Sequence, residues 1–588
     1  MRSVRGLGPG VGVTLLAMAL GTLPGLAAAP RFPSPLVLLG GGPAGSAIVA
    51  QALSLAGGAG ARVAILPLAS DHPEQASAAY RRYLDAFGVQ SFGLLSPTKA
   101  SAASPAVLRE EASADLLFFP GGDQRRLVSA LAGTPLLGAV FDAWRRGAVV
   151  AGTSAGAMPW GDTYIANGTS QGAFADAFDR DAQGRPGLEL EGGLRLVDDL
   201  LVDTHFDEDQ RLGRLLLAEA ATPSATAIGI DGGTAAILTG QTVHVLGAGA
   251  VTVLEAPRLL GNNALSAGPS DLFAAGPFEM QRLVGGQSYL LGSAMPEAVA
   301  QPLPAPTATP APGGFFGWFA SRPAAAPTPA PPVPVGPREP ITLIGDPVPP
   351  PESDAVADFV RDAGGTQARI LILSGDGAAR DAETWRSGLL VAGAGSATIQ
   401  TATDLHDQSL SVALEQATGI FFLEDDLGTL LTKLNAGQRN LGDIAALYAS
   451  RLPVGAAGLG TRILGDVAYF GQPGGTDREV MPGLHLLAGT VADDGFWQPA
   501  GLERLIQATL MAGHATGFGL GPGSALRVTG GQALAMGTQQ IVVLEGHGLQ
   551  ASTLPATNSV APASATGLEV SVLAPQGAYD LASFRPRF

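Results

Sequence analysis

The chain has 588 residues, 46% of them hydrophobic and 14% charged, so it is too long for one core and able to bury several. Its formal net charge of −17 argues against nucleic acid or an anionic membrane surface as a partner. The absence of cysteine excludes disulfides, thiolate metal sites and a cysteine nucleophile.

The amino terminus has the pattern of a signal peptide over residues 1–29. Arg2 and Arg5 precede an apolar run over residues 11–20, and small residues follow up to Ala29. The run is shorter than the roughly 20 residues that span a bilayer. We therefore expect an exported protein, periplasmic or extracellular, without membrane attachment after cleavage. The alternative is an uncleaved amino-terminal anchor or tail.

Strands and helices alternate through the next part of the chain, which we take as a domain over residues 33–300. Apolar runs predict buried strands over residues 35–42, 61–67, 114–123 and 148–153. Between them, helices are predicted over residues 46–56, 72–87, 124–132 and 134–146. Strands that are apolar throughout are typical of a parallel sheet covered by helices on both faces. Functional groups in such α/β sheets lie at the carboxyl ends of the strands.

Residues 301–340 are rich in proline and alanine and predict an extended linker. Beyond it, short segments recur in their original order: 37–40 as 342–345, 61–66 as 368–373, 116–119 as 419–422, 160–162 as 464–466, 193–197 as 483–487, and 251–255 as 541–545. Residues 341–588 are thus a predicted degenerate copy of the first domain. The expected fold is two tandem three-layer α/β/α domains with mostly parallel sheets, which could pair as an intramolecular pseudo-dimer.

The segment Gly152-Thr-Ser-Ala-Gly156 follows an apolar strand and fits the G-x-S-x-G nucleophile elbow. In that turn Ser154 would expose its hydroxyl, and the backbone N–H of Ala155 could face a developing oxyanion. The alternative is a glycine–serine turn without chemistry.

His205 is the best candidate for the general base, because it follows an apolar strand predicted in the same sheet as Ser154. We expect a helix after it from about Glu208, with His72 on the surface and His244 on an exposed strand position. The alternative reading of His205 is a helix-capping residue. Since serine precedes histidine here, the orienting acid should follow, and Asp231 lies in a suitable turn.

The second domain keeps the apolar segments but loses these polar groups. Ser154 corresponds to Gly458 and His205 to Gly495, while residues 121–124 become Glu424-Asp-Asp-Leu427. The second domain is therefore predicted to be a structural or binding copy.

Motifs shared with one family run through the first domain: Phe118-Phe-Pro-Gly-Gly-Asp-Gln124, Gly152-Thr-Ser-Ala-Gly-Ala157, Asp203-Thr-His-Phe206 with Arg211, and Gly229-Ile-Asp231. With these motifs the chain resembles the cyanophycinase family of serine peptidases (family S51), whose fold is like that of class I glutamine amidotransferases. The resemblance implies Ser154 as nucleophile and His205 as base. It implies an oxyanion hole formed by the N–H groups of Gly122 and Ala155.

The resemblance further implies a substrate pocket containing Asp123, Gln124, Thr204 and Arg211. It implies hydrolysis of cyanophycin, a poly-aspartate chain with arginine on each side-chain carboxyl, or of related Asp-containing peptides, without metal or cofactor. An amidotransferase is excluded because the chain has no cysteine.

Three positions depart from the family pattern. The family has a glutamate directly after the Ile-Asp of its last motif, where this chain has Gly232, and that glutamate orients the histidine. Thr204 replaces a glutamine, and Asp209 replaces an arginine. These departures favour a second hypothesis, in which the protein is a catalytically impaired pseudoenzyme that acts in binding or as a scaffold.

Overall fold

The computed structural model describes residues 30–93, 108, 113–176, 187–266, 272–292, 340–346, 349, 353–405, 407–425, 428–436, 452–470, 479–498, 500–513, 515–555 and 561–588. The predicted signal peptide and residues 301–339 of the predicted linker lie outside the described residues. We call residues 30–292 the N-terminal half and residues 340–588 the C-terminal half.

An eight-stranded sheet forms the outer end of the N-terminal half, in the order β15-β11-β10-β1-β5-β4-β2-β3. Its strands are β1 (Phe32–Leu39), β2 (Arg62–Ile65), β3 (Gln90–Gly93), β4 (Leu116–Phe119), β5 (Val149–Thr153), β10 (Thr234–Gly240), β11 (Thr242–Gly247) and β15 (Ser288–Leu290). From β1 to β3 neighbouring strands are parallel, whereas β10, β11 and β15 add an antiparallel edge. The sequence did not predict strand β3.

Helices cover both faces of this sheet. They are α1 (Ser46–Leu55) and α2 (Pro73–Asp85) on one face, and α4 (Gln124–Leu131) and α5 (Pro135–Arg145) on the other. Strand β1 shows why: Val37 packs in the cluster with α1 and α2, while Leu38 packs in the cluster with α4 and α5. Helix α5 is capped by the residue that precedes it, because the Thr134 side chain accepts a hydrogen bond from the N–H of Leu137 at the start of the helix.

A second, ten-stranded sheet runs through the centre of the molecule and contains strands from both halves. Its continuous path, in order, is β23 (Thr490–Asp493), β24 (Thr516–Gly519), β27 (Ile541–Glu545), β29 (Ser564–Leu573), β14 (Ala275–Val284), β12 (Ala250–Glu255), β9 (Thr226–Ile230) and β8 (Leu200–Thr204). Strands β13 (Gly261–Asn262) and β28 (Ala551–Thr553) pair beside this path. Neighbouring strands of this sheet are antiparallel from β9 through to β24. The sequence predicted mostly parallel sheets and did not predict this antiparallel one.

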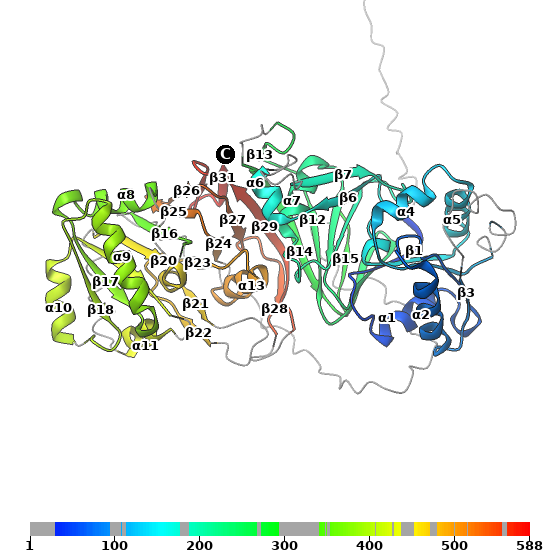
Figure 1. The fold of residues 1–588 in the computed structure, drawn as a ribbon, viewed down its shortest axis with the longest axis horizontal. Helices are drawn as coiled ribbons and strands as arrows, with labels where there is room; N and C mark the ends of the chain where they lie inside the picture. The colour runs from blue at the N-terminus through cyan, green and yellow to red at the C-terminus, as the bar shows by residue number, and fades with distance from the viewer. Residues whose placement is uncertain are drawn as a thin grey trace, which may run out of the picture.

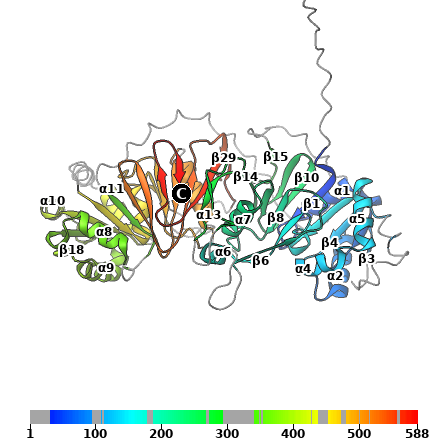
Figure 2. The same cartoon turned by 90° about the horizontal axis from the view of Figure 1, so that it is seen from above.

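The two halves join where β14 pairs with β29, as Figure 1 and Figure 2 both show. Opposed residues along this ladder include Phe278 with Val570 and Met280 with Leu568. Beside the ladder, the fully buried guanidinium of Arg282 lies 3.3 Å from carboxylate oxygens of Asp231 and of Glu503 in the C-terminal half. The halves therefore share backbone hydrogen bonds, an apolar core and a buried ion cluster.

The outer sheet of the C-terminal half has the order β18-β17-β19-β20-β16-β25-β26-β30-β31. Its strands are β16 (Ile341–Ile344), β17 (Arg369–Ser374), β18 (Ser396–Thr401), β19 (Gly419–Leu423), β20 (Val454–Ala457), β25 (Ser524–Thr529), β26 (Gln532–Gly537), β30 (Ala578–Asp580) and β31 (Arg585–Arg587). Its helices are α8 (Asp354–Asp362), α9 (Ala379–Val391), α10 (Asp407–Gln416) and α11 (Thr429–Ala436). Read from β30 to β18, the order repeats that of the N-terminal outer sheet strand for strand.

The remaining elements flank the central sheet. They are the hairpins β6 (Thr163–Gly168) with β7 (Leu188–Gly192) and β21 (Val467–Phe470) with β22 (Glu479–Pro482), and helices α6 (Ser170–Asp176), α7 (Leu212–Ala221) and α13 (Gly501–Met511). Within the described residues no single helix is both long and apolar enough for a membrane span. Helices α4 and α5 meet that test only together, across a bend of 97°.

Two local expectations were wrong. The helix after His205 begins at Leu212 and not near Glu208, because residues 206–211 form turns. His244 is buried and not exposed, because β15 covers the edge of β11 and the ring bonds with the hydroxyls of Thr239 and Ser288.

Cutting the chain between the halves tests whether the shared sheet holds them together. We expect that a protein carrying an engineered protease site within residues 301–339 elutes, after cleavage, as one species containing both fragments. The reason is that separation would expose the β14 and β29 edges and the Arg282 cluster. Size-exclusion chromatography under native conditions measures this. Two separately eluting fragments would contradict a permanent junction.

A buried acid on α7 predicts a pH-dependent stability. Burial, with Glu255 nearby, raises the pKa of Glu219 from 4.5 to about 9. The folded state then keeps a proton that the unfolded chain releases, so the unfolding free energy falls as the pH rises from about 4.5 to 9. We expect Glu219→Gln to flatten this dependence, by up to about 1.4 kcal/mol per pH unit. Urea unfolding at several pH values measures it, with exposed Glu74→Gln as the control.

Candidate active site

Ser154 lies at the sharp turn where β5 meets the short 3₁₀ helix η3 (Ser154–Gly156). Its backbone has φ of 53°, a left-handed conformation that is uncommon for serine and stores about 1–3 kcal/mol of strain. The turn is too tight for a side chain at Gly156, whose added Cβ would lie 2.0 Å from the carbonyl oxygen of Phe119. This is the nucleophile-elbow geometry that the sequence predicted, with the hydroxyl at the strand tip.

His205 reaches Ser154 from the other sheet. It follows β8 of the central sheet, and not a strand of the sheet that holds β5, so the expectation of one shared sheet was wrong. The His205 N–H donates to the carbonyl oxygen of Gly40 at 2.8 Å. The imidazole then lies against Gly41, where an added Cβ would be 2.2 Å from Nε2. His205 Nε2 is 3.0 Å from Ser154 Oγ, within hydrogen-bonding distance.

Backbone donors suited to an oxyanion lie beside the serine. The loop after β4 contacts Ser154, since an added Cβ at Gly121 would be 3.0 Å from Ser154 Cβ. The N–H of Gly122 donates no hydrogen bond to another described backbone or side-chain group. Ala155 is in the first turn of η3, where N–H groups have no acceptor within the helix. Gly122 and Ala155 thus both lie in segments that adjoin Ser154, and their role as oxyanion donors stays a prediction.

A buried ion cluster supports the residue that precedes His205. Asp203 is fully buried and accepts hydrogen bonds from Nε of Arg214 at 2.6 Å and from Nη1 of Arg211 at 3.2 Å. Arg211 also donates to the carbonyl oxygen of Thr204 at 2.7 Å and to Asp209 at 2.6 Å. Arg211 therefore holds the end of β8 and Asp209, and both of its terminal guanidinium nitrogens already bond within the protein.

The other predicted substrate residues are either buried or engaged in hydrogen bonds within the protein. Thr204 is 1% exposed, which corrects the expectation that it lines an open pocket. Gln124 donates through Nε2 to the carbonyl oxygens of Ile165 and Ala166, at 3.1 and 2.9 Å. Asp123 is exposed and caps α4 through the N–H of Arg125.

The structure does not bring Asp231 to His205. Asp231 Oδ1 accepts from the N–H of Asp207 at 3.2 Å, and Oδ2 accepts from the N–H of Ala250 at 2.8 Å and from Arg282. The carboxylate is buried on the side of the junction between the halves, with both oxygens engaged. This corrects the expectation that Asp231 orients the imidazole, because an oxygen would have to leave Asp207, Ala250 and Arg282 to reach it.

The described part of the chain supplies no hydrogen-bond partner to His205 Nδ1. An acid in the same turn that sequence reasoning missed is Glu208, whose carboxylate accepts a hydrogen bond from the N–H of Gly232 at 2.6 Å. The sequence signal was the proximity of Glu208 to His205, but a spacing of three residues alone does not show where the carboxylate points. Within the described residues no group of three or more His, Asp or Glu could hold a metal ion.

The C-terminal half retains the turn and fills the site. Gly458 has φ of 50°, close to the 53° of Ser154, but it carries no hydroxyl. At the position of the histidine is Gly495, where an added Cβ would be 2.8 Å from Arg504 Nη2 and 3.2 Å from Arg462 Nη2. Both arginines pair with buried Asp493. The space of the imidazole is thus occupied by an ion cluster.

The loop after β19 of the C-terminal half carries an internal acid instead of two glycines. Glu424 accepts hydrogen bonds from the N–H groups of Leu430 and Leu431 at the start of α11, at 3.0 and 2.7 Å. Burial raises its pKa to about 7. In the N-terminal half the corresponding loop lies against Ser154, whereas in the C-terminal half it is hydrogen-bonded to the start of α11.

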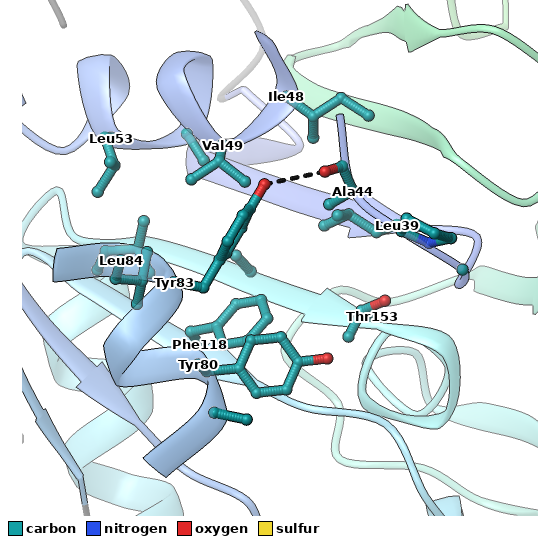
Figure 3. Close-up of a pocket in the computed structure, with 16 residues that line it drawn as sticks. Leu39, Ala44, Ile48, Val49, Leu53, Tyr80, Tyr83, Leu84, Phe118 and Thr153 are labelled. Carbon is teal, nitrogen blue, oxygen red and sulfur yellow. Dashed lines mark hydrogen bonds between the residues drawn. The ribbon is translucent and has the colours of Figure 1, made fainter. Parts of the chain in front are cut away.

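Two cavities lie near the site. One of about 290 Å³ separates α1 and α2 from the sheet, and Figure 3 shows Tyr80, Tyr83 and Phe118 along it and Thr153 at one end. Neither Ser154 nor His205 lines it. The other, about 530 Å³, lies between the halves and is lined by Asp209 and Gln210 of the turn after His205 and by side chains of the C-terminal half that include Trp497, Gln498 and Gln539.

Comparison with known proteins places the N-terminal half in a family. Residues 36–246 match the model of peptidase family S51. The chain is 35% identical over 206 residues to the cyanophycinase of Synechococcus elongatus, covering 34% of this chain and 61% of that protein. It is 32% identical over 219 residues to the cyanophycinase of Trichormus variabilis, covering 37% and 70%. The chain thus spans less than two thirds of the first of these relatives.

A crystal structure of a peptidase from an acI-B1 Actinobacterium aligns with 44% of this chain and 97% of its own, with 22% identity and a TM-score of 0.33. The family match falls entirely within the N-terminal half, which holds Ser154 and His205. Through that half, the chain belongs to peptidase family S51.

Proposed function

We propose that the protein is an exported serine-type peptidase of the cyanophycinase type, acting through an acyl-enzyme on Ser154. The observation that carries the proposal is the 3.0 Å contact between Ser154 Oγ and His205 Nε2, at a strained turn beside two backbone N–H groups. Export rests on the sequence pattern of residues 1–29.

In the first half of the proposed reaction His205 acts as a base. Its Nε2 accepts the proton of the Ser154 hydroxyl while Oγ forms a bond to the substrate carbonyl carbon. The carbonyl oxygen becomes an oxyanion, which the N–H groups of Gly122 and Ala155 stabilise. The carbon–nitrogen bond then breaks, and the proton on Nε2 passes to the leaving amine, which leaves an ester on Ser154.

In the second half water replaces the amine. Nε2 accepts a proton from water as the water oxygen attacks the ester carbon, and the same N–H donors hold the second oxyanion. The bond to Oγ breaks, and Ser154 regains the proton from His205. No step needs a metal or a redox group.

The proposed substrate is cyanophycin or a related Asp-containing peptide. Support comes from the relatives named cyanophycinase, at 32–35% identity over 206 and 219 residues, and from the family match over residues 36–246, which include the serine and histidine. We propose that the C-terminal half has no chemistry of its own, since Gly458 and Gly495 replace the reacting groups. It would serve the N-terminal half through the shared sheet and as one wall of the cleft beside the His205 turn.

One observation favours a second function, that of a catalytically impaired binding or scaffold protein. Position 232 carries no acid, and Asp231 is engaged by Arg282. Loss of the orienting acid from a triad lowers kcat by about 10⁴. A serine-reactive probe separates the two functions: a working pair labels Ser154 rapidly and only when His205 is present.

Hydrolysis by the mature protein tests the proposal. We expect release of β-Asp-Arg dipeptides from cyanophycin, falling to background in Ser154→Ala and in His205→Ala because either change removes the proton transfer to Nε2. Chromatography of the released dipeptides measures this.

The C-terminal half provides a matched control. Gly458→Ser in the Ser154→Ala background places a hydroxyl in a turn of nearly the same φ, but beside Gly495 and without an imidazole. We expect no recovery of release. Equal release from the unaltered protein and from Ser154→Ala would refute the proposed function.

A further inference from the structure

The turn that follows His205 carries Glu208 to the loop after β9. The N–H of Asp209 donates to the carbonyl oxygen of His205 at 3.1 Å, which closes this turn, and His205 begins it with a left-handed φ of 50°. Within the turn, Glu208 directs its carboxylate to the backbone of Gly232.

The carboxylate of Glu208 is held by the loop after β9, and that loop is hydrogen-bonded to the loop against which the imidazole lies. Its Oε1 accepts from the N–H of Gly232 at 2.6 Å. The next residue, Gly233, donates its N–H to the carbonyl oxygen of Gly41 at 2.8 Å, and Gly41 is the residue on which the His205 ring lies. The carboxylate is therefore connected to the imidazole through the backbone of Gly232, Gly233 and Gly41, a position that we call the rim of the Ser154–His205 pair.

Glu208 also occupies the space of a side chain at position 232. An added Cβ at Gly232 would be 2.6 Å from Glu208 Oε1 and 3.2 Å from Cδ. The φ of Gly232 lies outside the left-handed region, so its backbone would accept a side chain. A side chain at this position would displace the carboxylate that Glu208 brings there.

The other acids around the turn are committed elsewhere. Asp203 and Asp209 pair with Arg211, and Asp231 pairs with Arg282. Asp207 interacts electrostatically with Arg282 and Asp231. Glu208 has no arginine or lysine within ion-pair distance in the part of the chain that the structure describes, and its side chain is exposed.

We propose that Glu208 is the positioning residue of His205, supplying from the turn 205–209 the negative charge that position 232 does not carry. When Ser154 gives its proton to Nε2 the imidazole becomes positive, and a carboxylate at the rim stabilises that state. Glu208 does not touch the reacting atoms, and it acts through His205. This inference rests on the proposed function, because it assigns a role within the same serine–histidine pair.

The rate of Ser154 labelling by a fluorophosphonate probe tests the assignment without a peptide substrate. We expect Glu208→Gln to slow labelling at least about 10-fold, since it removes the charge and keeps the shape. The effect should shrink as salt screens the exposed carboxylate. Asp209→Asn is the matched comparator, because it removes an acid from the same turn that pairs with Arg211 and not with the Gly232 backbone.

Relocating the acid separates a positioning role from a merely structural one. Gly232→Glu alone should slow labelling, because its Cβ meets the Glu208 carboxylate and places two like charges together. Combined with Glu208→Ala, which vacates that space, Gly232→Glu should restore labelling above that of Glu208→Ala alone. A role of Glu208 in folding alone predicts no such rescue, and circular dichroism and Tm of each variant identify any loss of fold.

The outcomes distinguish this inference from the proposed function. Failure of the unaltered protein to label at Ser154 would overturn the proposed function, and the role of Glu208 with it. Rapid labelling of the unaltered protein that Glu208→Gln leaves unchanged would overturn the role of Glu208 alone. An equal loss in Asp209→Asn, or no rescue by relocation, would likewise overturn it in favour of a general charge or structural effect.

Discussion

The candidate site depends on the place where the outer sheet of the N-terminal half meets the central sheet. There, the loop after β1 forms backbone hydrogen bonds with the segments after β8 and β9. Gly40 accepts from the N–H of His205 and Gly41 from the N–H of Gly233. Ser154 comes from the outer sheet and His205 from the central sheet, so neither sheet alone assembles the pair. A side chain at Gly41 would occupy the imidazole position, which makes the backbone of this loop the surface on which the histidine is aligned.

The central sheet connects this contact to the C-terminal half. One carboxylate oxygen of Asp231 accepts a hydrogen bond from the N–H of Asp207, two residues after His205. The other oxygen forms an ion pair with Arg282, which also pairs with Glu503. The turn that carries the histidine is therefore braced by an acid that is itself held at the junction between the halves. Removing one member of a buried cluster of an arginine and two carboxylates destabilises the fold, because it leaves an uncompensated buried charge. The C-terminal half can thus matter to the site without carrying a nucleophile.

The glycine at position 232 leaves the space that the Glu208 carboxylate occupies. The carboxylate lies where a side chain at 232 would begin, so a side chain there would displace it. Asp231 cannot take the same place, since strand geometry directs it to the opposite side, toward Arg282. In the C-terminal half, arginines paired with Asp493 lie at Gly495, the position that corresponds to His205, so this fold retains its strands and turns when the polar groups are exchanged.

The sequence by itself determined the local features of this protein. Apolar runs located β1, β2, β4 and β5 of the N-terminal outer sheet, the glycines around Ser154 specified a tight turn, and the position of His205 after an apolar strand marked it as the partner. Each of these signals lies within a few neighbouring residues. Tertiary structure alone decided that β5 and β8 belong to different sheets, and that β14 pairs with β29 although 279 residues separate Val284 from Ser564. It also decided that Asp231 faces Arg282 while Glu208 faces Gly232. The physical reason is that strand pairing and the direction of a carboxylate are set by long-range packing and charge, which period and spacing along the chain do not encode.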